Sequence, residues 1–167
     1  MSGKTKKVSV GAGICDGCGR CVEACLSAGT KKHGKGIKKI AGIKLLKSDT
    51  GFVPVVCRNC EDAPCATACM SGGRHRNGKG WVVTDYTRCI GCWMCIMNCP
   101  FGAIERVEDE HIALKCEGCL DKEIPPCVAA CERGILGHGN IQDLSSAVRK
   151  KAAARFLTGE REDTPAK

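Results

Sequence analysis

The chain carries the sequence CIGCWMCIMNC at residues 89–99, in which four cysteines are separated by two, two and three residues. Three other groups of four cysteines repeat this spacing closely. In chain order the four groups are Cys15, Cys18, Cys21 and Cys25; Cys57, Cys60, Cys65 and Cys69; Cys89, Cys92, Cys95 and Cys99; and Cys116, Cys119, Cys127 and Cys131. They contain all 16 cysteines of the 167-residue chain, so one repeated motif organises the whole sequence.

The spacing in the first and third groups is typical of thiolates that bind a cubane 4Fe-4S cluster. In such a run three cysteines bind one cluster, and the fourth binds a second cluster. A gap of two residues lets the chain curl around one corner of the cube, so that backbone N–H groups point toward the sulfurs. Gly17, Gly19 and Gly91 lie in or beside these loops, where a missing side chain allows close backbone approach. Four groups therefore predict four 4Fe-4S clusters.

Zinc sites and disulfides are the competing interpretations of paired cysteines. Two cysteine pairs complete a zinc site, which leaves the third and fourth cysteines of each group without a role. Residues 1–4 begin no apolar secretory segment, so we expect no export to an oxidising compartment and a cytoplasmic protein. No apolar run is long enough to span a bilayer. A module that binds zinc or nucleic acid is an alternative interpretation of the protein's function, from a third functional class.

The composition fits a protein whose core depends on its cofactors. Aromatic residues make up only 4% of the chain, which is poor material for a conventional core. We therefore expect the clusters to supply the missing core, and the chain to be unfolded without iron. The formal net charge is +8. Four oxidised clusters with their thiolates bring roughly eight negative charges, so the basic balance compensates the cofactors rather than indicating nucleic acid.

Short strand-like stretches precede the four cysteine groups, at residues 8–10, 53–56, 81–85 and 111–115. The unit of strand, cysteine loop and short helix thus occurs four times, and two such units normally form one ferredoxin-type lobe. The interval between the first two groups is rich in lysine: Lys31, Lys32, Lys35, Lys38, Lys39, Lys44 and Lys47. Residues 26–50 therefore predict an inserted surface segment, with a docking face for an acidic partner as the alternative.

The C-terminal region predicts a helix over residues 140–158. Asn140 is its expected N-cap, and Leu144, Val148 and Ala152 recur at helical spacing. We expect the first turns of this helix to pack on the protein. The tail at residues 159–167 offers nothing apolar to bury, so we expect it to be disordered.

These motifs resemble the four-cluster ferredoxin-like electron-transfer subunits found beside molybdenum or tungsten oxidoreductases, formate hydrogenlyase and carbon monoxide dehydrogenases. The resemblance covers about residues 8–136. It depends on the sequences CRNCEDAPC at 57–65 and CIGCWMCIMNCPFGAI at 89–104, and on the proline-bearing loop before Cys127. The sequence at 89–104 and the proline-bearing loop before Cys127, together with CMSG at 69–72, are most similar to the iron–sulfur partner of nickel carbon monoxide dehydrogenases.

Spacing alone equally allows sequential pairing of the cysteine groups. The resemblance implies instead that the first group pairs with the fourth and the second with the third. Four predicted cysteine sets follow: set 1 is Cys15, Cys18, Cys21 and Cys131; set 2 is Cys57, Cys60, Cys65 and Cys99; set 3 is Cys89, Cys92, Cys95 and Cys69; and set 4 is Cys116, Cys119, Cys127 and Cys25.

The resemblance further implies a small α+β fold with two ferredoxin-like lobes. The outer lobe is expected to combine residues 1–50 with 104–139, and the inner lobe to span 51–103. The implied function is non-catalytic, with no catalytic residues. Trp93 and Phe101 are expected to pack against a cluster rather than to carry electrons.

The expected role is electron relay between a catalytic oxidoreductase subunit and a ferredoxin, flavoprotein or other redox partner. A carbon monoxide dehydrogenase is the preferred catalytic subunit. A tungsten or molybdenum aldehyde or formate oxidoreductase, or a hydrogenase, is the alternative. A free soluble polyferredoxin is the alternative of another class. We expect neither a nucleic-acid partner nor a membrane span.

Overall fold

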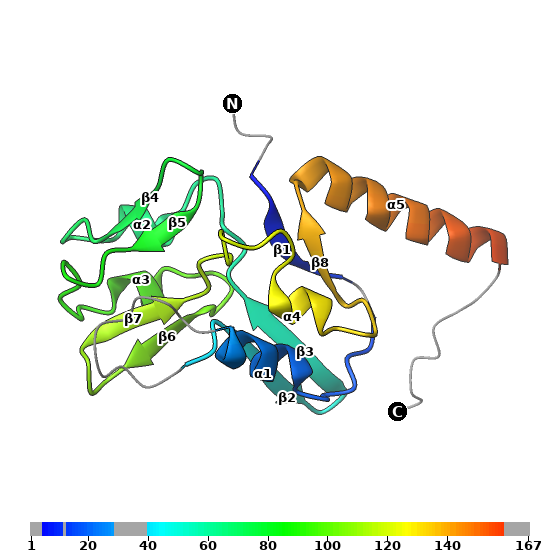
Figure 1. Ribbon diagram of the computed structural model, residues 1–167, viewed down its shortest axis with the longest axis horizontal. Helices are drawn as coiled ribbons and strands as arrows, with labels where there is room; N and C mark the ends of the chain where they lie inside the picture. The colour runs from blue at the N-terminus through cyan, green and yellow to red at the C-terminus, as the bar shows by residue number, and fades with distance from the viewer. Residues whose placement is uncertain (1–4, 12, 29–39, 159–167) are drawn as a thin grey trace.

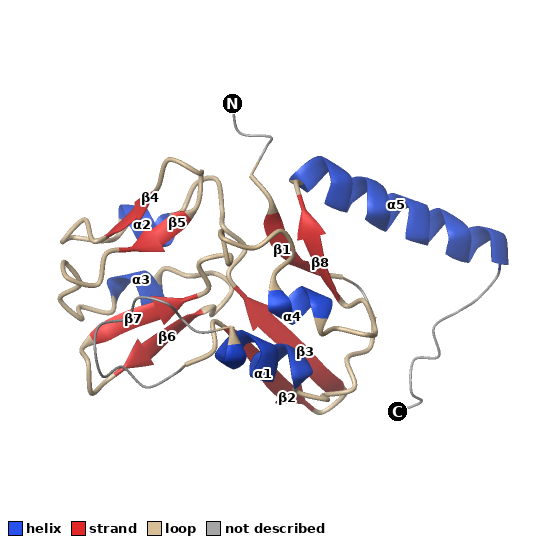
Figure 2. Cartoon of the chain, viewed as in Figure 1, coloured by secondary structure: helices blue, strands red, loops and turns tan. Residues whose placement is uncertain are grey.

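The computed structural model of the protein describes residues 5–11, 13–28 and 40–158. Short helices and small two-stranded antiparallel sheets alternate in it, joined by many loops (Figure 2), which agrees with the predicted α+β class. In chain order the elements are β1 (Lys7–Val10), α1 (Arg20–Ser27), β2 (Ile43–Ser48), β3 (Gly51–Val56), α2 (Pro64–Thr67), β4 (Arg74–Arg76), β5 (Val82–Thr84), α3 (Met94–Met97), β6 (Ile104–Val107), β7 (Ile112–Lys115), α4 (Pro126–Ala129), β8 (Leu136–Gly139) and α5 (Ile141–Thr158).

The four predicted strand-like stretches are confirmed as β1, β3, β5 and β7, each of which leads toward a cysteine loop. Each pairs with a strand that the sequence did not reveal. β2 pairs with β3, β4 with β5, and β6 with β7, so these six strands form hairpins. β1 pairs instead with β8, in a register that places Lys7 opposite Gly139 and Val10 opposite Leu136. This pairing joins the two ends of the cysteine-bearing region.

The elements gather into two halves of similar construction (Figure 1). The inner half contains α2, α3 and the hairpins β4–β5 and β6–β7; in it α2 contacts α3 and β4, and α3 contacts β6. The outer half contains α1, α4, the hairpin β2–β3 and the pair β1–β8; in it α1 contacts α4 and β2, and β1 contacts β3. The lobe boundaries stay a prediction. That prediction assigns β3 to the inner lobe and β6–β7 to the outer lobe, whereas β3 packs in the outer half and β6–β7 in the inner half.

The predicted surface segment at residues 26–50 ends in an ordered strand. Ile43–Ser48 pairs with β3 along its whole length, and Ile43 is only 1% exposed. The lysines made this strand difficult to predict from the sequence. Lys44 and Lys47 lie outside the core, and Lys44 forms an ion pair with Glu105 on β6. The five lysines between residues 31 and 39 lie outside the described residues, as does the tail at 159–167.

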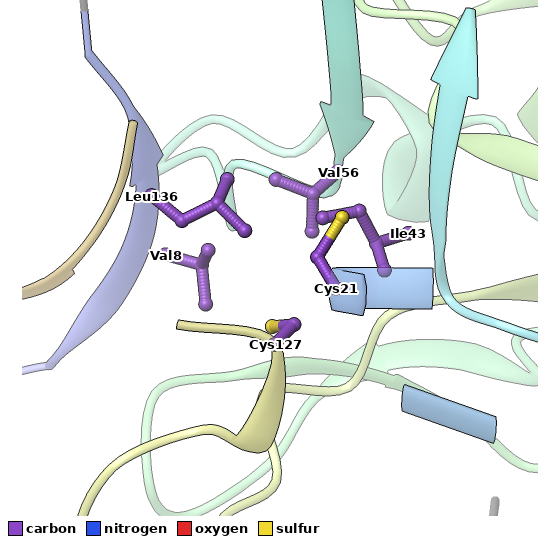
Figure 3. Close-up of a cluster of buried hydrophobic side chains, with 6 residues drawn as sticks. All are labelled: Val8, Cys21, Ile43, Val56, Cys127 and Leu136. Atoms are coloured by element: carbon purple, nitrogen blue, oxygen red, sulfur yellow. The ribbon is translucent and has the colours of Figure 1, made fainter. Parts of the chain in front are cut away.

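The core of the outer half combines aliphatic and cysteine side chains (Figure 3). It lies between β1, α1, β2, β3, α4 and β8, and its buried members are Val8, Cys21, Ile43, Val56, Cys127 and Leu136. A smaller cluster in the inner half contains Cys95, Ile104 and Ala113, with Cys65 and Cys99 packed against it. Cysteines therefore take core positions in both halves.

The predicted C-terminal helix is confirmed as α5. The Asn140 side-chain oxygen accepts hydrogen bonds of 3.0 and 2.9 Å from the backbone N–H groups of Gln142 and Asp143, which is the expected N-cap. Only the first turn packs on the protein, where half-buried Leu144 lies over β8. The rest extends away from the body (Figure 1), and Val148 is 59% exposed. Within the described ranges, no helix combines the length and the apolar character needed to cross a membrane.

Candidate metal centres

The four cysteine loops share one backbone feature. The residue directly before the second cysteine has a positive φ in every loop: Gly17 at 76°, Asn59 at 46°, Gly91 at 65° and Gly118 at 85°. Glycine adopts this left-handed conformation freely, and asparagine is among the few other residues that tolerate it. The conformation turns the chain sharply between the first two cysteines. Sequence analysis singled out Gly17 and Gly91 but missed Asn59 and Gly118, whose positions in the repeat would have revealed them.

The third cysteine of each group lies on a short helix. Cys21 and Cys95 lie on α1 and α3, and Cys65 and Cys127 lie on α2 and α4. Pro64 and Pro126 begin α2 and α4, one residue before the cysteine. Proline suits the first helical position because its φ is already helical and the N–H that it lacks has no partner there. In every group the first two cysteines thus lie outside the helices and the third lies on one, and α1 carries Cys25 as well.

Three of the predicted cysteine sets each line one cavity. Set 1 lines one cavity, set 3 a second and set 2 a third. All four members of each set take part, including the cysteine that comes from the other sequence group. Among the described residues, no three His, Cys, Asp or Glu side chains converge closely enough to share a single metal ion. Four thiols around one cavity fit the corners of a cubane cluster.

Three members of set 4 lie in the core of the outer half. Cys25, Cys116 and Cys127 all belong to its cysteine-containing core cluster. Burial raises the pKa of the Cys127 thiol to about 12, and the neighbouring charges of Cys25 and Cys119 contribute to this rise. Burial also raises the pKa of the Cys119 thiol, again with a contribution from Cys25. The structure therefore brings Cys25, from the first group, to the cysteines of the fourth group.

Backbone N–H groups point at the sulfur of the last cysteine in three of the four groups. Gly42 donates to Cys25 Sγ at 3.3 Å, Arg74 to Cys69 Sγ at 3.2 Å and Ala103 to Cys99 Sγ at 3.4 Å. Although burial opposes it, the hydrogen bond from the Arg74 backbone lowers the pKa of the Cys69 thiol. Such N–H···S bonds stabilise negative charge on sulfur, which in iron–sulfur proteins adjusts the reduction potential.

The four sets follow one another in the order 1, 4, 2, 3. Sets 1 and 4 meet in the outer core, which contains both Cys21 and Cys127 (Figure 3). Sets 4 and 2 are neighbours, since Lys115 lines the cavity of set 2 and the next residue, Cys116, belongs to set 4. Sets 2 and 3 meet in the inner core, where Cys65 and Cys99 pack against Cys95. Only Cys18 and Cys92 are exposed among the 16 cysteines, and they belong to the two terminal sets.

Two buried cations lie among these cysteines and were missed by the sequence analysis. Arg74 on β4 is 3% exposed and Lys115 on β7 is 2% exposed. Arg74 lines the cavity of set 3, and Lys115 lines that of set 2. Arg74 Nη1 is buried and has no hydrogen-bond partner among the residues that the structure describes. Such burial is costly for a charged group unless negative charge lies nearby. This unpaired nitrogen beside four thiols fits the binding of a negatively charged cluster.

The aromatic residues expected near the clusters lie beside the cavities. Half-buried Trp93 lines the cavity of set 3 and packs against the inner cysteine core, with the Arg106 guanidinium 4.8 Å from its ring centroid. Phe101 lines the cavity of set 2, with the Arg58 guanidinium 5.3 Å from its ring centroid. Both positions agree with packing beside the predicted clusters.

Comparison with known proteins identifies the family. Residues 48–141, more than half of the chain, match the 4Fe-4S dicluster domain. The chain belongs to the 4Fe-4S dicluster domain family. It is therefore an iron–sulfur protein of the ferredoxin-like electron-transfer class, as the cysteine spacing predicted.

Relatives of this 4Fe-4S dicluster protein carry electron-transfer names. An uncharacterised ferredoxin of Methanocaldococcus jannaschii is 36% identical over 151 residues, which cover 90% of this chain and 82% of the relative. The electron transport protein HydN of Escherichia coli is 32% identical over 168 residues, covering 87% of this chain and 95% of HydN. The B subunit of the anaerobic dimethyl sulfoxide reductase of Escherichia coli is 38% identical over 97 residues, covering 56% of this chain and 47% of that subunit.

Proposed function

We propose that the chain is a non-catalytic electron-transfer subunit that carries four 4Fe-4S clusters, one on each cysteine set. The observation that supports this most strongly is that sets 1, 2 and 3 each line one cavity with all four cysteines, while Cys25, Cys116 and Cys127 of set 4 share one core cluster. Each bound cluster would supply a one-electron redox centre. The chain's own residues hold it through four thiolates, donate backbone N–H groups to the sulfurs and exclude water with the surrounding apolar side chains.

In this proposal the two halves of the molecule are the two ferredoxin-like lobes. The outer half holds the clusters of sets 1 and 4, and the inner half holds those of sets 2 and 3. The cluster order 1, 4, 2, 3 forms a single route whose ends carry the exposed cysteines Cys18 and Cys92. Electrons would therefore enter and leave at sets 1 and 3, while sets 4 and 2 connect them.

The partner at one end is proposed to be a catalytic oxidoreductase subunit, and the other end serves a ferredoxin, flavoprotein or other redox protein. Our preferred catalytic subunit is a carbon monoxide dehydrogenase, which rests on the sequence motifs around residues 69–72 and 89–104. The similarity to the B subunit of dimethyl sulfoxide reductase favours a second candidate, a catalytic reductase or aldehyde or formate oxidoreductase of another type. A hydrogenase partner and a free polyferredoxin also stay compatible with the sequence, and the cytoplasm remains the proposed location.

Anaerobic purification from the native host tests both levels of this proposal. We expect about sixteen irons and sixteen sulfides per chain, together with a co-purifying catalytic subunit that mass spectrometry identifies. About eight irons would contradict the four-cluster assignment. If the chain has its full iron content and co-purifies with a carbon monoxide dehydrogenase, the preferred partner is supported. Co-purification with another oxidoreductase would assign the subunit to that enzyme instead. Full iron content in an isolated monomer would support the free carrier.

A further inference from the structure

The two charged side chains that are buried in the described part of the molecule both lie in the middle of the cysteine array. Arg74 and Lys115 are 3% and 2% exposed. Neither forms an ion pair with an acidic side chain within the described residues, where the five ion pairs involve other cations. An uncompensated buried cation is expensive, so its position calls for a source of negative charge.

Arg74 lies between sets 3 and 2. Its Nη2 donates a hydrogen bond of 2.7 Å to the carbonyl oxygen of Ala113 on β7, and its buried Nη1 has no partner in the described part of the chain. The side chain lines the cavity of set 3. Ala113 is buried in the inner cluster with Cys95 of set 3, and Cys65 and Cys99 of set 2 pack against that cluster. The cation therefore lies beside cysteines of both inner sets.

Lys115 lies between sets 2 and 4. Its Nζ donates hydrogen bonds to the carbonyl oxygen of Val82 and, at 2.9 Å, to that of Cys116. The side chain lines the cavity of set 2, while the next residue, Cys116, belongs to set 4. Set 2 is thus the set that lies beside both cations.

A fixed cation changes the redox behaviour of a neighbouring cluster. Reduction adds one negative charge to a group that is already negative, and this costs less beside a positive charge. The interior has a lower effective dielectric than water, so the effect is larger for a buried cation than for an exposed one. Carbonyl oxygens solvate the two side chains but bring no net charge that would cancel theirs.

We propose that Arg74 and Lys115 are tuning residues that raise the reduction potentials of the clusters in the middle of the route, most strongly at set 2. Arg74 acts on the clusters of sets 3 and 2, and Lys115 acts on those of sets 2 and 4. Electrons would then rest in the interior rather than at the exposed ends. This inference depends on the proposed four-cluster function.

Redox titration of the cluster-loaded protein, followed by electron paramagnetic resonance, tests the proposal. The neutral variants are Arg74→Gln and Lys115→Gln, and the charge-keeping variants are Arg74→Lys and Lys115→Arg. We expect each neutral variant to lower the reduced-to-oxidised ratio of at least one cluster about tenfold at a fixed potential, a shift of about 59 mV for a one-electron couple. The signal that shifts in both variants should be the one that Cys60→Ser alters, because Cys60 belongs to set 2.

The matched control is Arg76→Gln, which removes an exposed cation from the same strand. Arg76 donates to the carbonyl oxygens of Cys60 and Glu61, both at 2.6 Å, so it contacts the same cysteine loop. Solvent screens its charge, and we expect a change below about threefold. The charge-keeping variants should also change the ratio by less than about threefold.

The outcomes separate charge from shape. Fully loaded neutral variants with unchanged potentials, or equal shifts in neutral and charge-keeping variants, would overturn the inference. If the neutral variants lose clusters, retention in Arg74→Lys and Lys115→Arg supports the need for charge, and loss in those variants as well overturns it. A wild-type chain without four clusters contradicts the proposed function itself, whereas unchanged potentials in a loaded protein contradict only the tuning role.

Discussion

The side-chain oxygen of Asn59 accepts a hydrogen bond of 2.9 Å from the backbone N–H of Val82, and its Nδ2 donates to the carbonyl oxygen of Gly80 at 3.0 Å. The amide thereby fixes the cysteine loop of the second group to β5. Asn59 is only 1% exposed and has a φ of 46°. One residue therefore supplies both the turn between Cys57 and Cys60 and the attachment of that turn to the inner half.

Replacing Asn59 separates these two contributions. Asn59→Ala removes the acceptor of the buried Val82 N–H, while the Gly80 carbonyl oxygen keeps its hydrogen bond from Arg76 Nη1. It also places alanine in the left-handed region, so we expect a loss of about 2–4 kcal/mol. Asn59→Gly restores the backbone freedom and should recover about 1 kcal/mol of that loss. The measurement is the thermal unfolding midpoint of the cluster-loaded protein. Equal midpoints for the two variants would show that the left-handed turn contributes no strain.

The turn in the fourth group depends on close packing against Trp81. A Cβ added to Gly118 would lie 2.5 Å from the Trp81 ring, and the φ of Gly118 is 85°. Gly118→Ala should therefore cost about 2–4 kcal/mol through strain and overpacking and lower the iron content. Gly134→Ala is the control, because Gly134 also has a positive φ but an added Cβ meets no atom within 4 Å. We expect a loss of about 1 kcal/mol there, with full iron.

Pairs of cysteine variants test the proposed sets. Cys25→Ser and Cys127→Ser should alter the same cluster signal, since both residues belong to set 4, and combining them should add little. Cys25→Ser and Cys21→Ser should alter different signals, although the two residues are neighbours on α1. Electron paramagnetic resonance of the reduced protein makes this comparison. If Cys25→Ser alters the same signal as Cys60→Ser, and not the signal that Cys127→Ser alters, sequential pairing is favoured instead.

The exposed part of α5 should be dispensable for cluster binding. Leu144 is the apolar residue of α5 that packs over β8, whereas Phe156 and Leu157 are 90% and 88% exposed. A chain that ends after residue 147 should retain full iron and an unchanged unfolding midpoint. Leu144→Ala in the full chain should lower stability by about 1–2 kcal/mol. Loss of iron on truncation would show that the exposed turns support the fold directly.

Sequence spacing predicted much of this molecule because cysteine loops have strict local requirements. The strands before each loop and the capped helix at Asn140 appear where short-range patterns placed them. β4, β6 and β8 were not predicted, because each is defined by its hydrogen-bonded partner rather than by its own sequence. β8 in particular pairs with a strand from the other end of the described chain.

The buried cations show a different limit. In a sequence, Arg74 and Lys115 resemble the many other basic residues of a chain with 26 lysines and arginines. Their burial depends on how β4, β5 and β7 meet, which brings carbonyl oxygens within reach of both side chains. Single-residue chemistry cannot reveal this, because the same residue types normally lie at the surface.

The pairing of β1 with β8 has a consequence for biosynthesis. A growing chain contains every cysteine of sets 2 and 3 once Cys99 has been made, but Cys127 and Cys131 are needed for sets 4 and 1. β1 also has no partner until Leu136–Gly139 has been synthesised. Under the proposed sets, the inner half can receive its clusters on the ribosome, whereas the outer half must wait with Cys15, Cys18 and Cys21 unprotected. Under these sets, any cluster insertion during synthesis would be completed first in the inner half, and Cys15, Cys18 and Cys21 would remain without a cluster for longest.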